Sequence, residues 1–169
     1  RGRFEIRCPA CGEAASAAPT AEARALQPLS VYAWTKKQQE EQCLMAAETF
    51  GFPVTILRYF NVYGSGQSLR NPYTGIVSIF YSRLQAGASI SLYEGGTPGR
   101  DFVHVADVAR ANRLALESAV PSGTICNIGS GCECTIREVA ETLSKASGLP
   151  ARFEDRGEFR VGDIRSCYA

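Results

Sequence analysis

A short apolar run, PVTILRYF at residues 53–60, constrains the fold more than any other stretch of this sequence. It is rich in β-branched and aromatic residues, and it has too few polar positions for a strand with one face in water. The run therefore predicts a buried strand of a parallel sheet. Parallel strands need a crossover connection between them, so helices and strands should alternate along the chain.

The segments around this run alternate as a parallel sheet requires. A helix is predicted at about 31–50, with Ser30 as its N-cap and with Gly51 and Pro53 ending it. The strand is followed by NVYGSGQSLRNPYTG, which we interpret as a loop at the carboxyl end of the sheet, where open α/β folds bind ligands. Further strands are predicted at 89–93, 101–105 and 124–128, and further helices at about 75–86, from Asp107 to about Ser118, and within TIREVAETLSKASG.

Two of these helices carry specific predictions about their first residues. Asp107 is expected to cap the third helix, and Thr135 with Glu138 should form a capping box at the start of the last one. His104, the one histidine of the chain, falls in an apolar strand pattern and is interpreted as a structural residue, not as a base.

Composition excludes several classes of protein. With 169 residues, of which 45% are hydrophobic, the chain can bury a core as one ordinary soluble domain. Its 18 basic and 17 acidic residues are interspersed, so we expect no nucleic-acid partner. The sequence shows no signal peptide and no apolar run of about 18 residues, so we expect no membrane partner. Seven irregularly spaced cysteines fit reduced thiols, and these features together predict a cytoplasmic protein.

Cys8 and Cys11 open a loop, residues 8–28, that is rich in Ala and Pro and has no helical or strand periodicity. Two cysteines separated by two residues have the spacing of a zinc knuckle, but a tetrahedral structural site needs four ligands. The only other close pair, Cys132 and Cys134, is separated by a single residue. We therefore predict no metal site and keep zinc at Cys8 and Cys11 as the alternative.

Tyr32 and Lys36 lie four residues apart at the start of the first predicted helix, so they share one helix face. An ammonium group beside a phenol favours the phenolate, which would let Tyr32 accept a proton near neutral pH. Tyrosine and lysine also occur at this spacing by chance. The spacing alone leaves open both a proton-transfer pair and two ordinary surface residues.

Six motifs, read in chain order, resemble the C-terminal half of an extended short-chain dehydrogenase/reductase: SVYAWTK, ILRYFNVYG, NPYTG, RDFVHVADVARA, NIGSG and FRVGDIR. The chain is most similar to the NAD-dependent sugar-nucleotide epimerases and dehydratases, and RCPACG followed by NPYTG resembles their dTDP-L-rhamnose 4-epimerase-like members. This resemblance implies an α/β fold that combines the C-terminal part of a Rossmann-like parallel sheet with a small mixed α/β substrate-binding domain.

The resemblance also implies a division of the chain. Residues 1–29 would be a cysteine-bearing loop, 30–64 the end of the Rossmann-like domain, and 65–169 mostly the substrate-binding domain, with about 101–128 returning to the Rossmann-like domain. The glycine-rich NAD-binding turn of the family has no counterpart in these 169 residues. We therefore expect a fragment that is inactive alone and that forms a homo-oligomer or associates with a complementary N-terminal half.

Roles for individual residues follow from the same resemblance. Tyr32 and Lys36 would be the catalytic pair and would contact NAD, with Tyr59 as a further cofactor contact. The residues that would bind the nucleotide-sugar substrate are Asn61, Tyr93, Arg100 and Arg160. The implied activity is that of a sugar-nucleotide 4-epimerase, which oxidises the sugar 4-hydroxyl transiently and causes no net redox change.

Two other functions stay open at this point. Within the enzyme class, the motifs also fit a sugar-nucleotide 4,6-dehydratase or a decarboxylating relative. Outside it, the chain would be a non-catalytic binding or assembly module, which the cysteine-bearing loop would make zinc-dependent.

Overall fold

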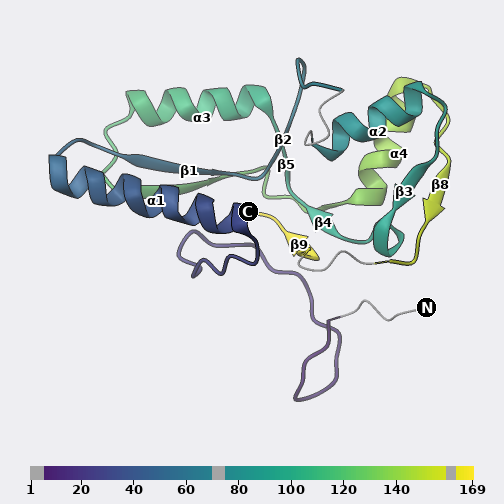
Figure 1. Cartoon of the computed structure of the whole chain (residues 1–169), viewed down its shortest axis with the longest axis horizontal. Coiled ribbons are helices and arrows are strands. Elements are labelled where there is room, and N and C mark those ends of the chain that lie inside the picture. The colour runs from purple at the N-terminus through teal and green to yellow at the C-terminus, as the bar shows by residue number, and fades with distance from the viewer. Residues whose placement is uncertain (1–5, 70–74, 159–162) are drawn as a thin grey trace.

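A computed structural model describes residues 6–69, 75–158 and 163–169 of the chain (Figure 1). The fold is mixed α/β, as predicted, and it contains parallel strand pairs. In chain order the elements are α1 (Val31–Phe50), β1 (Thr55–Tyr59), β2 (Asn61–Tyr63), α2 (Ile76–Gln85), β3 (Ile90–Leu92), the short helix η1 (Tyr93–Gly96), β4 (Gly99–Arg100), β5 (Phe102–His104), α3 (Val105–Glu117), β6 (Thr124–Ile128), β7 (Cys134–Thr135), α4 (Ile136–Ser147), β8 (Phe153–Asp155) and β9 (Ser166–Cys167).

The buried strand predicted from the apolar run is β1, and its partner is β6. The two strands are parallel and pair in register from Thr55 opposite Thr124 to Tyr59 opposite Ile128. α1 lies on one side of this pair and α3 on the other (Figure 1). The strand predicted at 124–128 is therefore confirmed, and so is its parallel arrangement with the apolar run.

A loop was predicted directly after Phe60, and this prediction is wrong for the first three residues, Asn61–Tyr63. Asn61–Tyr63 form β2, which pairs in parallel with β5. The Phe60 N–H donates to the Ile128 carbonyl (3.1 Å), and the Asn61 N–H donates to the Asp101 carbonyl (3.0 Å). The acceptors of these hydrogen bonds are distant in sequence. Their pairing with Phe60 and Asn61 favours a strand, although the nearby glycine and polar residues favour a turn.

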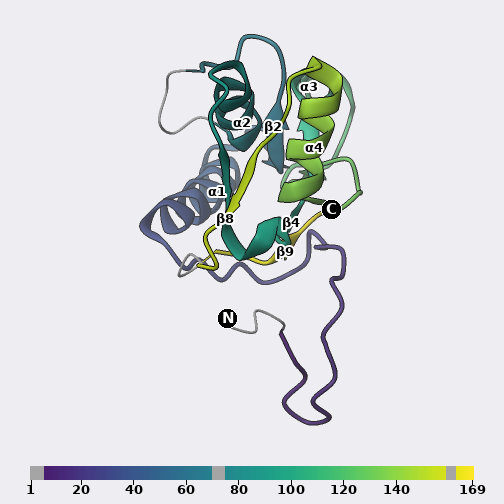
Figure 2. The ribbon, with the colours of Figure 1, turned by 90° about the vertical axis from the view of Figure 1, so that its right-hand side faces the viewer.

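The buried apolar core lies among α2, β3 and α4, and Figure 2 shows the ribbons of these elements from the side of the molecule on which they lie. α2 and α4 pack against each other, β3 pairs in parallel with β8, and β4 is the middle strand of a three-stranded sheet with β7 and β9. The buried residues of this core are Phe80, Leu84, Ile90, Leu92, Val139 and Ala140. The strands β4, β7, β8 and β9 were not predicted, because their two or three residues do not form an apolar run like those that predicted β3 and β5.

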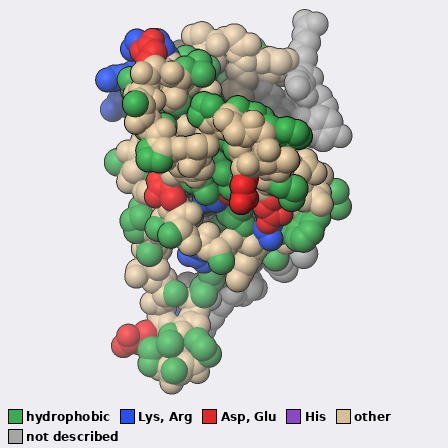
Figure 3. All heavy atoms as spheres, turned by 90° about the vertical axis from the view of Figure 1, so that its left-hand side faces the viewer, with side chains coloured by type: hydrophobic (Ala, Val, Ile, Leu, Met, Phe, Trp, Pro, Cys, Tyr) green, Lys and Arg blue, Asp and Glu red, His purple; other side chains and the backbone are tan. Residues whose placement is uncertain are grey.

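The part of the fold built from α1, β1, α3 and β6 is more open. α1 has no fully buried residue. Phe50 at its end is 75% exposed, and Leu116 near the end of α3 is 89% exposed. Figure 3 shows the face at these two helix ends, where apolar side chains lie among polar ones. This part of the fold therefore presents apolar surface that the described residues do not cover.

The ends of the helices test the capping predictions. Ser30 caps α1 by accepting the Ala33 N–H (3.1 Å), and the capping box of Thr135 and Glu138 is complete. The cap predicted for α3 is wrong, because the Nδ1 atom of His104 accepts the Ala106 N–H at 3.2 Å and starts the helix earlier. Asp107 lies in the first turn instead. None of the helices in the described ranges combines the length and apolarity of a membrane span.

Candidate active site

Tyr32 and Lys36 lie together on the first turns of α1, as their spacing predicted. The Lys36 Nζ atom is 5.6 Å from the centroid of the Tyr32 ring. Tyr32 is 72% exposed, and Lys36 is exposed and donates to the Gln39 side-chain oxygen at 3.2 Å. The phenol and the ammonium are therefore neighbours that a ligand can reach.

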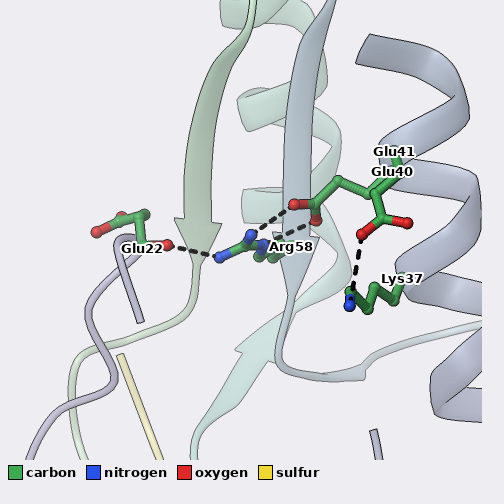
Figure 4. Close-up of polar contacts among 5 residues, drawn as sticks. All are labelled: Glu22, Lys37, Glu40, Glu41 and Arg58. Atoms are coloured by element: carbon green, nitrogen blue, oxygen red, sulfur yellow. Dashed lines mark hydrogen bonds and ion pairs between the residues drawn. The ribbon is translucent and has the colours of Figure 1, made fainter. Parts of the chain in front are cut away.

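An ion pair of Arg58 with Glu40 fixes α1 against the sheet (Figure 4). The two side chains meet in a bidentate contact, with Nε to Oε2 at 2.9 Å and Nη2 to Oε1 at 2.6 Å. Both are mostly shielded, with 21% and 13% of the side chains exposed. The hydrogen bond from Glu40 raises the pKa of Arg58, and this effect outweighs burial, which lowers it. The pair thus sets the distance between β1 and the helix that carries Tyr32.

The segment before α1 is fixed from the opposite side. The remaining Arg58 nitrogen, Nη1, donates to the Glu22 carbonyl at 2.8 Å. The Glu22 carboxylate accepts the Asn127 N–H at 3.1 Å, and this bond lowers the pKa of Glu22. The Asn127 side chain in turn donates to the Thr20 carbonyl at 2.7 Å. These contacts connect the approach to α1 with the carboxyl ends of β1 and β6.

Tyr59 points toward α3, whereas Tyr32 lies on α1. Its hydroxyl donates to the Asn112 side chain of α3 at 2.9 Å, whereas the preceding Arg58 reaches toward α1. Successive strand residues point to opposite faces, so Tyr59 occupies the face of the sheet away from α1. Asn61, the first residue of β2, has an exposed side chain beyond the end of β1.

Three predicted substrate residues belong to the second half of the chain. The Arg100 guanidinium donates to Asp163 (2.6 Å) and to the Gly99 carbonyl (2.8 Å), and its side chain is only 14% exposed. Tyr93 begins η1 and is 38% exposed. Arg160 lies outside the described residues. The Arg100 guanidinium is therefore paired with a carboxylate of the same chain.

Asp101 is a central residue that sequence reasoning missed. Its side chain is fully buried. One carboxylate oxygen accepts the Ser130 N–H (2.6 Å) and hydroxyl (2.7 Å), and the other accepts the Gly131 N–H (2.9 Å) and the Ala169 N–H (3.1 Å). Burial raises the pKa of Asp101, but these hydrogen bonds outweigh it and hold the pKa below its ordinary value. The available signal was a charged residue directly before the apolar run that predicted β5.

The NIGSG turn is shaped by this carboxylate. A Cβ atom on Gly129 would lie 2.4 Å from the nearer Asp101 carboxylate oxygen, so only glycine fits there. The backbone of Asp101 also accepts the Asn61 N–H, and Arg100 precedes it in the chain. Asp101 thus connects the NIGSG turn to two residues that were predicted to bind substrate.

An open depression of 510 Å³ lies at the other end of α1, lined by residues that include Leu44, Phe52 and Gly123. Tyr32 and Lys36 are on the opposite end of this helix. We therefore do not assign the depression to the active site.

Known proteins resemble the chain in sequence. A family model described as the NAD dependent epimerase/dehydratase family matches residues 8–129. The chain belongs to this family. The dTDP-L-rhamnose 4-epimerase of Burkholderia thailandensis is 40% identical over 139 residues, which make up 82% of this chain and 38% of that protein. The dTDP-glucose 4,6-dehydratase of an Actinoplanes species is 35% identical over 131 residues, which make up 78% and 39%.

Solved structures of epimerase relatives agree with the fold. The Thermus thermophilus UDP-glucose 4-epimerase, in complex with NAD, superposes with a TM-score of 0.79 at 32% identity, over 92% of this chain and 50% of that one. This epimerase/dehydratase family chain thus spans half or less of the length of these relatives. The resemblance implied by the motifs and the Rossmann-type fold class are confirmed.

Proposed function

We propose that this chain carries the proton-transfer residues and part of the substrate site of an NAD-dependent sugar-nucleotide 4-epimerase. The observation that carries the proposal is the pair of Tyr32 and Lys36, exposed together on α1 with Nζ 5.6 Å from the ring centroid. The names of the epimerase relatives support the substrate class. The rest of the active site would come from a glycine-rich NAD-binding half like that of the family.

Tyr32 is placed to take the proton of a sugar hydroxyl. Its hydroxyl can accept this proton as the phenolate and return it to the same oxygen later, as positioned general acid–base catalysis requires. Lys36 would assist this transfer from the same helix face, where its ammonium lies 5.6 Å from the centroid of the Tyr32 ring. In a 4-epimerase both proton transfers involve the oxygen on one sugar carbon, so a single tyrosine suffices for both.

The residues present fit NAD at this position. Lys36 has three donors, of which one contacts Gln39, so it can also bond the hydroxyls of the nicotinamide ribose. When bound, NAD supplies reversible hydride acceptance from the carbon that bears the hydroxyl. Tyr32 and Lys36 would hold its nicotinamide end, whereas the pyrophosphate would need a glycine-rich turn like that of the family's NAD-binding half.

Arg100 would hold the substrate diphosphate. A guanidinium is always charged and binds anions through paired donors, and Arg100 already binds the Asp163 carboxylate. A diphosphate oxygen would use the same donor geometry. Asn61 and Tyr93 would contact other parts of the sugar nucleotide, as the family resemblance implies.

A sugar-nucleotide 4,6-dehydratase is the second candidate, because a dehydratase relative matches 78% of the chain. Both activities begin with oxidation of the 4-hydroxyl, so both use Tyr32 in the same first step. Product analysis separates them, since a dehydratase loses water from the sugar and an epimerase does not.

The test is a chimera that joins the 169 residues to the N-terminal half of the Burkholderia thailandensis relative. In this protein, Tyr32→Phe should lower kcat for epimerisation by about 100-fold or more, because positioned general acid–base catalysis contributes that much. The KM for the nucleotide sugar should change far less. Tyr81→Phe, on α2, is the matched control and should leave kcat unchanged. A Tyr32→Phe enzyme within about twofold of the parent would remove Tyr32 from the mechanism.

A further inference from the structure

The guanidinium of Arg58 bonds both α1 and the segment that precedes this helix. Its Nε and Nη2 atoms donate to the two carboxylate oxygens of Glu40 on α1, at 2.9 and 2.6 Å. Its Nη1 atom donates to the Glu22 carbonyl at 2.8 Å, and Figure 4 shows the guanidinium between these two partners. Every nitrogen of the guanidinium therefore has a partner in a segment that leads to or carries the proposed catalytic pair.

The ion pair lies on the face of α1 that carries Tyr32 and Lys36. Tyr32, Lys36 and Glu40 follow one another at intervals of four residues, and residues at this spacing lie along one side of a helix. The bidentate contact fixes the rotation of α1 about its axis, because two parallel hydrogen bonds define the relative orientation of a guanidinium and a carboxylate. The rotation of α1 in turn decides the direction in which Tyr32 and Lys36 point.

Apolar packing does little to orient α1. None of its residues is fully buried, and Tyr32 is 72% exposed. The Glu40 side chain bonds a strand, whereas the side chains of Thr35 and Lys36 form their hydrogen bonds within the helix. A polar contact with the sheet therefore contributes more to the orientation of α1 than it would in a helix with a buried apolar face.

We propose that Arg58 is a positioning residue for the reaction of Tyr32, because through Glu40 it sets the rotation of α1 at which Tyr32 and Lys36 meet the reacting sugar. This inference rests on the proposed function and adds to it a residue that acts through the helix, not by contact with substrate. The contact with Glu22 extends the role to the approach of α1. Asn127, which lies opposite Arg58 in the register of β1 and β6, bonds the same segment.

The first measurement uses the 169-residue chain itself. Lysine keeps the positive charge of Arg58 but lacks the planar fork, so Arg58→Lys should retain attraction to Glu40 and lose the fixed orientation. Amide hydrogen exchange should become about tenfold faster in α1 and in residues 20–22. Exchange in α4, which packs against α2, should stay as in the parent. An unchanged rate in α1 would overturn the inference.

The second measurement uses the chimera with the N-terminal half of the Burkholderia thailandensis relative. A displacement of reacting groups by about 1 Å can lower a rate by about 100-fold, so Arg58→Lys should lower kcat by about 10- to 100-fold. The KM for the nucleotide sugar should change by less than about threefold, since Asn61, Tyr93 and Arg100 lie outside α1. A kcat within about twofold of the parent would overturn the positioning role.

Glu40→Gln breaks the same contact from the helix side while it keeps the shape of the side chain. This variant should also lower kcat with little change in KM. The double variant with Arg58→Lys should lose little more than the larger single loss, because both substitutions act on one contact. Losses of kcat that multiply in the double variant would show that the two residues act separately and would overturn the inference.

Val139→Ala is the control for stability. It removes buried methyl groups from the core around α2 and α4, so it destabilises the fold without changing the contacts of α1. Its kcat, measured well below the melting temperature, should equal that of the parent. A loss of kcat as large as that of Arg58→Lys would show that the rate follows stability, and it would overturn the positioning role.

Tyr32→Phe in the same chimera separates this inference from the proposed function. A Tyr32→Phe enzyme with the kcat of the parent would refute the proposed function and, with it, the positioning of Tyr32 by Arg58. A loss of kcat in Tyr32→Phe without one in Arg58→Lys would refute the positioning role alone. We expect both variants to lose kcat, with the larger loss in Tyr32→Phe.

Discussion

The buried carboxylate of Asp101 fixes the position of the NIGSG turn and of the C-terminal residue Ala169. Its carboxylate accepts four hydrogen bonds from Ser130, Gly131 and Ala169 and has no water contact of its own. An amide at this position would turn one oxygen into a donor that faces N–H donors. We therefore expect Asp101→Asn to lower the free energy of unfolding by about 2–3 kcal/mol. Asp107→Asn, in the exposed first turn of α3, should cost less than about 1 kcal/mol.

The pH dependence of this effect has a definite sign. The pKa of Asp101 in the folded chain is below its ordinary value, which is about 3.9 in an unfolded chain. Its contribution to stability is therefore complete above that unfolded value and is lost as the pH falls through the folded pKa. Urea unfolding from pH 7 to pH 2 measures the free energy of unfolding of the parent and of Asp101→Asn. The difference between the two free energies should become smaller only below about pH 4. A free-energy difference that stays constant down to pH 2 would contradict the conclusion that the charged form of Asp101 stabilises the fold.

Sequence reasoning found the residues whose signal is local and missed those whose partners are distant. Tyr32 and Lys36 were recognised because a helix places them on one face, and the structure does so. Asp101 and Arg58 were missed as structural residues because their partners, such as Ser130 and Glu40, follow only from the fold. A charged residue in an apolar strand indicates a buried partner without naming it.

At the scale of elements, the position of α1 depends on one shielded ion pair. Removing Glu40 would leave the Arg58 guanidinium mostly buried without its bidentate partner. We expect Glu40→Ala to lower the free energy of unfolding by about 1–3 kcal/mol. The neighbouring pair of Lys37 with Glu41 spans 3.5 Å on the surface of the same helix (Figure 4), so Glu41→Ala should cost at most about 0.5 kcal/mol.

Thermal and urea unfolding of the two variants measure this difference, and each serves as the control for the other. Both remove one glutamate from the middle of α1, so helix propensity changes equally. An equal decrease in the free energy of unfolding for Glu40→Ala and Glu41→Ala would show that burial of the Arg58–Glu40 pair contributes nothing to stability.

The elements themselves were predicted to different degrees for a physical reason. α1, β6 and α4 were found with close bounds, because caps and apolar periodicity are written in adjacent residues. The strands β2, β4, β7, β8 and β9 were missed, since they lack the apolar runs that predicted β3 and β5 and form through pairing with distant segments. The start of α3 was misplaced because His104, not Asp107, provides its cap.

For the whole molecule, the uncovered face at the ends of α1 and α3 predicts self-association. Phe50 and Leu116 are 75% and 89% exposed there, and Figure 3 shows further apolar side chains on this face. Joining two such faces removes apolar area from water, which is favourable by about 25 cal/mol per Å². The 169-residue chain should therefore associate in a concentration-dependent way.

The substitutions that test this prediction separate association from folding. Phe50→Lys combined with Leu116→Lys should reduce the mass measured by light scattering, because it places charge on the face that would be buried. The melting temperature should stay unchanged, since both side chains are exposed within one chain. Gln38→Lys adds a charge to an exposed position of α1 without removing apolar surface, so it should leave the association intact. A parent chain that remains a monomer at high concentration would mean that this face is not a contact surface.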